Sequence, residues 1–172
     1  PTPTFVEDGA SVTLFSGTNI STIEPGEKIQ SLTFTVSGVV DGSAEKISFD
    51  GTPISLVSGS GTTSTNNLAY TVSVVSGTAT LTFTNGAGLT TATMQSLINN
   101  LSYSDITQQP TAGARIVTLT QIVDTGGVAN GGVDTRTLAI SNTVNVVAVN
   151  DAPTITSTPS TVNYDEYAEP TS

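Results

Sequence analysis

The chain has 172 residues, 14 of them acidic and 4 basic, and contains no cysteine, histidine or tryptophan. Without cysteine or histidine it has no disulfide, no thiol nucleophile, no Ser-His-Asp triad and neither of the usual zinc ligands. The formal charge of −10 argues against nucleic acid and anionic membranes as partners, because both recruit lysine and arginine. The length fits one ordinary domain, or one domain with a fragment of a second.

The composition favours strands over helices. The sequence contains 32 threonines, 20 serines and 18 valines. Only 10% of the residues are charged, against about 25% in a typical globular domain. Threonine and valine are β-branched and suit a pleated sheet, whereas the good helix formers are scarce. We therefore expect an all-β fold.

Apolar and polar residues alternate along most of the chain, as in half-buried strands. The expected strands are Ser11 to Phe15, Ile29 to Ser37, Lys46 to Asp50, Leu68 to Val75, Thr78 to Thr84, Ala114 to Ile122 and Thr137 to Val149. Glycine and asparagine turns separate them, without the βαβ rhythm of a parallel sheet, which predicts an antiparallel sandwich. Its expected core comprises Leu32, Phe34, Val36, Ile47, Phe49, Tyr70, Val72, Leu81, Phe83, Ile116, Leu119 and Val144.

One segment departs from the period of two. Between residues 90 and 101 the apolar positions are Met94, Leu97, Ile98 and Leu101, which is the spacing of one helix face. Thr90 and Thr91 precede it as capping candidates. We expect one short inserted helix over about 90–101, lying across an end or edge of the sandwich.

A boundary follows the last expected strand, at Asn150-Asp151-Ala152-Pro153. Proline restricts the residue before it to extended geometry, so the chain should leave the domain stiffly. Residues 1–151 are expected to form the module, and 152–172 a linker with an opening strand, Thr154-Ile155-Thr156. Tyr164-Asp165-Glu166 repeats the pattern of Val6-Glu7-Asp8. This indicates a second copy beginning after roughly 150 residues, although two acidic patches can also match by chance.

Several motifs together resemble a known family. They are Phe5-Val6-Glu7-Asp8-Gly9, Val36 to Gly42, Val123 to Gly127 with Asn130-Gly131-Gly132 and Asp134-Thr135, and Val149-Asn150-Asp151-Ala152-Pro153. The chain resembles the tandem cadherin-like extender modules of giant bacterial RTX-type adhesins, which are exported by type I secretion. The resemblance implies an Ig/cadherin-like, calcium-binding β-sandwich without enzymatic activity. It also implies an extracellular place on the bacterial surface and a part in adhesion or biofilm formation.

The acidic residues suit Ca²⁺, which takes six to eight oxygen ligands. With 14 acids and 4 bases, at least ten carboxylates lack a Lys or Arg partner. Clustered carboxylates repel one another, and a divalent cation relieves that repulsion.

Four groups of residues are candidate calcium ligands. Asn150 and Asp151 lie where a linker ligand would lie. Asp124 enters a glycine-rich loop with Asn130 and Asp134 as companions. The other groups are Glu7 with Asp8, and Asp41 with Glu45. Asp8-Gly9, Asp41-Gly42 and Asn130-Gly131 can equally be plain turns. Asp165, Glu166 and Glu169 would serve the next copy.

We expect calcium at the Asn150-Asp151 junction, held also by Glu7 or Asp8 and by Asp124, with Asp134 as a further candidate. Such an ion would turn a hinge between neighbouring repeats into a rigid rod. The alternative is a calcium-dependent module that binds a sugar or peptide, so that a cell-surface glycan or protein receptor would be its partner. A carboxylate-only glycosidase is disfavoured because nine aromatic residues, all Phe or Tyr, leave little for a sugar platform.

Overall fold

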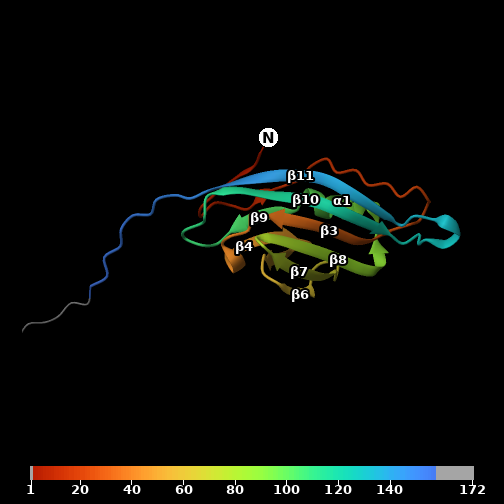
Figure 1. Ribbon diagram of the computed structural model, residues 1–172, viewed down its shortest axis with the longest axis horizontal. Helices are drawn as coiled ribbons and strands as arrows, with labels where there is room; N and C mark the ends of the chain where they lie inside the picture. The colour runs from red at the N-terminus through yellow and green to blue at the C-terminus, as the bar shows by residue number, and fades with distance from the viewer. Residues whose placement is uncertain (1, 158–172) are drawn as a thin grey trace, which may run out of the picture.

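The computed structural model describes residues 2–157 and shows a β-sandwich with one helix, as the composition predicts. Figure 1 shows the strands running along the long axis of the molecule, with the segment after β11 leading away at one end. The strands of the larger sheet are β1 (Thr4–Val6), β3 (Ile29–Ser37), β6 (Gly59–Thr62), β7 (Ala69–Val75), β8 (Thr78–Leu89), β10 (Gly113–Asp124) and β11 (Thr135–Val147). Those of the smaller sheet are β2 (Val12–Thr13), β4 (Glu45–Phe49), β5 (Thr52–Ser55) and β9 (Ser102–Asp105).

The larger sheet has the order β1-β11-β10-β3-β8-β7-β6, and the smaller sheet has the order β2-β9-β4-β5. All pairings are antiparallel except β1 with β11, which run parallel. The seven predicted strands of the module are present, and four short ones, β1, β5, β6 and β9, were not predicted. The predicted opening strand Thr154-Ile155-Thr156 is not formed. Two short 3-10 turns, η1 (Gly42–Ala44) and η2 (Ala129–Gly131), complete the described elements.

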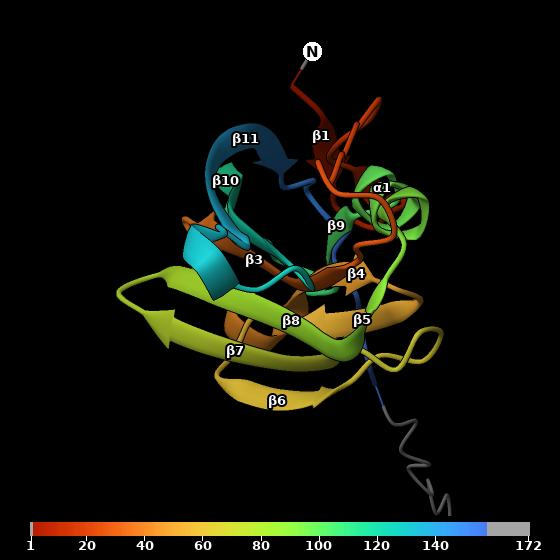
Figure 2. The same ribbon diagram turned by 90° about the vertical axis from the view of Figure 1, so that its right-hand side faces the viewer.

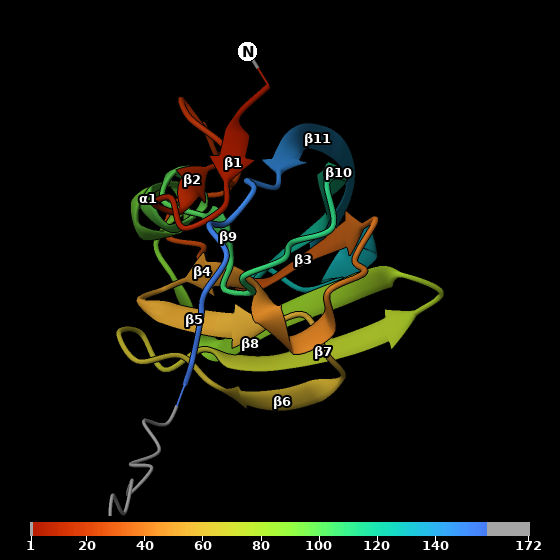
Figure 3. The same ribbon diagram turned by 90° about the vertical axis from the view of Figure 1, so that its left-hand side faces the viewer.

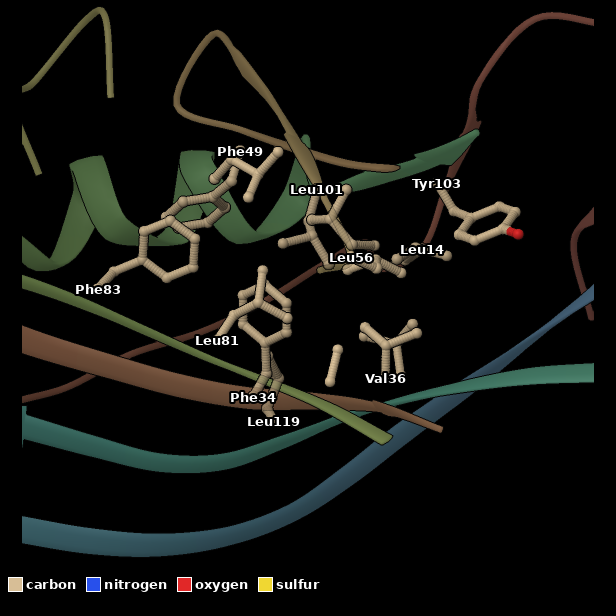
Figure 4. Close-up of a cluster of buried hydrophobic side chains, with 14 of the residues drawn as sticks. Leu14, Phe34, Val36, Phe49, Leu56, Leu81, Phe83, Leu101, Tyr103 and Leu119 are labelled. Atoms are coloured by element: carbon tan, nitrogen blue, oxygen red, sulfur yellow. The ribbon is translucent and has the colours of Figure 1, made fainter. Parts of the chain in front are cut away.

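The core fills the space between the sheets with alternate residues of each strand. β3 shows the pattern most clearly, since Leu32, Phe34 and Val36 are fully buried while Thr33 and Thr35 lie outside. Figure 4 shows Phe83, Phe34 and Phe49 gathered near the helix and Tyr103 at the far end of the cluster. The hydroxyl of Tyr103 points away from the other side chains.

Two members of the predicted core are placed differently. Ile116 is 42% exposed, because Arg115 and Val117 take the inward positions of β10. Tyr70 is only partly buried and packs at the margin of the core. The prediction for Ile116 was therefore wrong by one residue of register, and such a shift moves a side chain to the other face of the sheet.

The predicted helix is confirmed as α1 (Thr91–Asn99), with Thr90 as its N-cap. The Thr90 side chain accepts a hydrogen bond from the Thr93 amide, which satisfies one of the free donors of the first turn. Met94 and Ile98 are buried in the core, so the helix covers an edge of the sandwich. No helix in residues 2–157 is long and apolar enough to span a membrane.

The strand directions define two ends of the molecule. At one end β3 and β11 finish and β4 and β10 begin; we call it the exit end, because the chain leaves there after Val147. At the other end β10 turns into β11 through residues 125–134. β10 pairs with β11 from Gly113↔Val146 to Val123↔Thr135. At about 3.3 Å per residue the two ends are therefore about 30 Å apart.

Candidate metal centre

Three carboxylates meet at the exit end: those of Asp41, Glu45 and Asp105. Glu45 begins β4 and Asp105 ends β9, and the two are paired across the smaller sheet. Asp41 precedes the short turn η1 that leads into β4. One oxygen of each residue lies within 4.8 Å of the others, close enough to hold one metal ion. Ca²⁺ bonds oxygen at about 2.3–2.6 Å, so this spacing is compatible with a shared ion.

Arg115 already neutralises part of this group. Its Nε donates to Glu45 Oε2 at 3.1 Å and its Nη2 to Glu45 Oε1 at 3.0 Å, forming a two-point contact. Glu45 Oε1 also accepts from the amides of Val40 and Asp41, both at 2.9 Å. Burial opposes the charge of Arg115, but hydrogen bonding and the charge of Glu45 outweigh it and raise the pKa of the guanidinium. Most of the hydrogen-bonding capacity of the Glu45 carboxylate is therefore already taken up by Arg115 and by these two amides.

Asp41 is held by Thr111 as well as by Arg115. Thr111 donates its amide to Oδ2 at 2.8 Å and its hydroxyl to Oδ1 at 2.6 Å, and Arg115 Nη2 reaches Oδ2 at 3.2 Å. Burial acts to raise the pKa of Asp41, but the bonds from Thr111, the contact with Asp105 and the charge of Arg115 together lower it. Asp41 is therefore the ionised partner of the acidic pair that it forms with Asp105.

Asp105 has the opposite character. It is 4% exposed, and its Oδ2 has no hydrogen-bond partner. Its Oδ1 accepts from the Thr107 amide at 3.0 Å. Burial, with the nearby charges of Asp41 and Glu45, raises the pKa of Asp105. The hydroxyl of Tyr103, two residues earlier on the same face, is also buried without a partner. Buried polar atoms nearly always have partners, so these two are candidate contacts for a bound cation.

Glu7 provides a third such atom at the exit end. It follows β1 directly, and its amide donates to the Val147 carbonyl at 3.0 Å, which continues the pairing with β11. Its Oε2 accepts from the Val149 amide at 2.7 Å, while Oε1 is buried without a partner. Glu7 is only 6% exposed. It therefore ties the start of the fold to the segment by which the chain leaves.

The other predicted residues of the exit end are exposed. Asp8 is in a left-handed conformation (φ 58°), and the Gly9 amide donates to the Val6 carbonyl at 2.8 Å. Asp8-Gly9 therefore forms a plain turn, which was the alternative to a calcium ligand at this position. Asp8 Oδ1 accepts from Gln108 Nε2 at 2.8 Å. Asn150 and Asp151 lie on the exposed segment beyond β11, where the Asn150 amide group donates to the Asp151 carbonyl.

The Asp124 group lies at the opposite end. Asp124 Oδ1 accepts from the Gly126 amide at 2.9 Å, and the Asp124 amide donates to the Asp134 carbonyl at 2.9 Å. Asn130 is exposed, in a left-handed conformation (φ 55°) inside η2. A Cβ on Gly126 would overlap Glu27 Oε1, so Glu27 reaches into the same loop. Burial and the charges of Asp124 and Glu24 raise the pKa of Glu27.

The expectation that Asp124 shares one calcium site with the other acidic groups of the same module is therefore wrong. Asp124 and Asp134 cannot share an ion with Glu7, Asp8, Asn150 or Asp151 of the same module, because about 30 Å of β10 and β11 separates them. Glu7 and Asp8 instead lie at the same end of the sandwich as Asp41 and Glu45. Asp165, Glu166 and Glu169 lie outside the described residues.

No sequence motif points to Asp105 or Arg115, although strand periodicity carries a signal for them. Glu45 precedes the inward-facing Ile47 by two residues, and Arg115 precedes Val117 by two. If the alternation of inward-facing residues is continued by one step on each strand, Glu45 and Arg115 fall in the core. Charged side chains are uncommon there unless they are paired or bind a ligand. Asp105 follows the inward Tyr103 in the same way.

The raised pKa of Asp105 predicts a pH dependence in the metal-free protein. Above the usual pKa of 3.8 the unfolded chain gives up this proton while the folded chain retains it. The free energy of unfolding should therefore fall as pH rises through the folded pKa. Asp105→Asn should remove this fall and stabilise the protein at neutral pH. Urea unfolding in a chelator between pH 4 and 8 tests this, and parallel pH profiles for the two proteins would contradict it. The lowered pKa of Asp41 acts only at more acidic pH.

Comparisons of the chain with known protein families, with curated proteins and with solved structures found no match.

Proposed function

We propose that this chain is a calcium-stabilised structural module of a large bacterial surface adhesin, in which copies are joined end to end as an extender. The proposal places the module outside the cell, with neighbouring copies as its partners. It draws on the motifs described above and on the acidic exit end. It assigns the module no catalytic role.

The observation that carries the proposal is the set of buried, unpartnered oxygen atoms at the exit end. Glu7 Oε1 and Asp105 Oδ2 are both removed from water without a hydrogen bond. A buried acceptor without a donor costs about 1–3 kcal/mol, and more when it is charged. A hard cation with oxygen ligands removes that cost. Asp41, Glu45 and Asp105 are the residues whose oxygens lie close enough together to share one ion. Glu7, at the same end, is a separate candidate ligand through its unpartnered Oε1.

The position of Glu7 connects such an ion to rigidity. Glu7 accepts from the Val149 amide, just beyond the last strand. An ion bound by Glu7 would fix the first residues of the exit segment to β1. The hinge between two copies would then begin further from the sandwich, and the array would bend less.

Thermal unfolding in calcium and in chelator tests the proposal. A ligand at a hundred times its Kd stabilises the folded state by about 2.7 kcal/mol. For a domain of this size that corresponds to a rise in Tm of about 5–10 °C. Glu7→Gln and Asp105→Asn should each reduce this rise, because each removes a charged ligand.

Asp50→Asn is the matched control. Asp50 is also a buried carboxylate, 5% exposed, at the far end of β4. Its oxygens, however, accept hydrogen bonds from Thr63 and Asn66. This variant should lower Tm by the same amount with and without calcium. An unchanged Tm of the parent chain on chelation would rule out the calcium role.

The alternative, a calcium-dependent sugar- or peptide-binding module, needs an ion with open positions facing solvent. The unpartnered oxygens are instead buried, and Arg115 closes the same group from within. These features favour a structural ion over a ligand-binding one. Addition of glycans to the calcium-loaded protein should therefore leave Tm unchanged.

A further inference from the structure

The last strand has an edge that is only partly covered. β11 pairs with β10 along almost its whole length, from Thr135 to Val146. On its other side, β1 pairs only through Thr4↔Asn145, Phe5↔Val146 and Val6↔Val147. Within residues 2–157 no strand lies beside residues 135–141 on that side. We call this stretch the β11 edge. Unpaired edges of this kind readily accept a further strand.

Hollows adjoin both ends of the β11 edge. One hollow of about 510 Å³ is lined by Thr2, Pro3, residues 13–16, Ser141 and Asn142, so it begins where β1 begins. A second, of about 440 Å³, is lined by residues 20–24 and 133–136 with Ile29, Ile122 and Asp124, where β11 begins. Figures 2 and 3 look along the molecule from its two ends and place β1 between β11 and α1. The hollows thus lie on the line along which β1 would continue toward its N-terminus.

An apolar side chain on the β11 edge lacks a cover. Leu119 and Ile140 are paired across β10 and β11, so they point to the same side of the sheet. Leu119 is 3% exposed, whereas Ile140 is 52% exposed. The inner side of the sheet is therefore filled at Leu119 of β10 and left open at Ile140 of β11.

We propose that the exit segment of another copy of this chain, residues 152–158, fills this space as a strand that continues β1 and pairs in parallel with the β11 edge. The inference rests on the proposed end-to-end arrangement of copies. Each copy would then lend seven residues to the sheet of the next.

The register of β1 supports this occupant. Continuing the pairing of Thr4 with Asn145 backward along the chain places the seven residues before Pro1 opposite residues 135–141. If these seven are Ala-Pro-Thr-Ile-Thr-Ser-Thr, as in residues 152–158, the isoleucine falls on the same face as the buried Phe5. Its counterpart on β11 is Leu138, which already packs against the core.

The chemistry of the exit segment also fits. It is rich in β-branched residues, and its proline is tolerated on an edge strand. In its own copy the described part of the segment, residues 152–157, forms no strand, and Ile155 is 95% exposed. One copy therefore offers an uncovered apolar strand, and the next offers an uncovered apolar edge.

Grafting residues 152–158 directly before Pro1 of the 172-residue chain tests the proposal, with all measurements made in chelator. Hydrogen–deuterium exchange of residues 135–141 should slow about tenfold or more, because the newly paired amides exchange only on opening. Tm should rise as well. The control graft has the same length but carries Ile155→Asp in the grafted copy, and it should give neither effect.

The receiving side has its own control. Ile140→Asp should cost the ungrafted chain little, since Ile140 is half exposed, but should abolish the protection given by the graft. Unchanged exchange at residues 135–141, or equal protection by the Ile155→Asp graft, would overturn the proposal. Because no calcium is present, this outcome is independent of the calcium melting experiment, which uses no graft.

Discussion

Replacing Arg115 with leucine should lower the free energy of unfolding by about 3–5 kcal/mol in chelator, one of the largest losses that a single substitution can cause here. The side chain of Arg115 is 3% exposed and is the only cation in contact with Glu45 and Asp41 among the described residues. Its removal leaves buried carboxylates without a counter-charge. Urea unfolding of the two proteins measures the loss.

Two comparisons make the Arg115 experiment specific. Arg136→Leu removes an exposed arginine from β11 and should change stability by no more than about 0.5 kcal/mol. Calcium should restore more stability to Arg115→Leu than it adds to the parent chain, because the ion replaces the lost charge. An equal calcium effect in both proteins would show that the ion does not share the carboxylates of Arg115.

Phe83→Ala should cost a similar amount, about 3–5 kcal/mol, through loss of packing. Phe83 is completely buried, and its ring lies 4.5 Å from that of Phe49, 5.6 Å from that of Phe34 and 6.0 Å from that of Tyr70. Truncation would leave a cavity in the centre of this cluster (Figure 4). Equilibrium unfolding in urea is again the measurement.

The Phe83 variant also separates core stability from metal binding. Its loss should be the same with and without calcium, because the aromatic cluster lies away from the exit end. Val75→Ala, at a position 69% exposed, should change stability by less than about 0.5 kcal/mol. A reduced calcium effect in Phe83→Ala would mean that the core and the acidic end are coupled.

The sandwich was predictable because its strands are long enough for the period of two to show. From Ser31 to Ser37, β3 alternates buried apolar residues with threonine and serine, and the period of α1 differs clearly from its surroundings. The short strands were not predictable in this way. β1, with three residues, exists because β11 offers it a partner, and β9, with four, depends on pairing with β4.

The candidate metal centre was predicted only in part. Glu7 and Asp41 were found because they belong to recognisable motifs. Asp105 has no motif around it, and it reaches Glu45 only through a pairing between segments sixty residues apart in sequence. The sequence also gave no means of deciding which end of the sandwich each acid occupies. Strand direction alone separates Asp124 from Glu7, and it depends on the whole topology.

The parallel pairing of β1 with β11 has a mechanical consequence. The chain enters through β1 and leaves after β11, and these strands lie side by side and point the same way. A pull on the two ends of the module, as flow would exert on a tethered chain, draws them past each other in opposite directions. The force is then carried in shear by all the hydrogen bonds between them at once, from Asn145 with Pro3 to Glu7 with Val147. The bonds must break together rather than one by one, so the join between β1 and β11 resists tension applied to the two ends of the module.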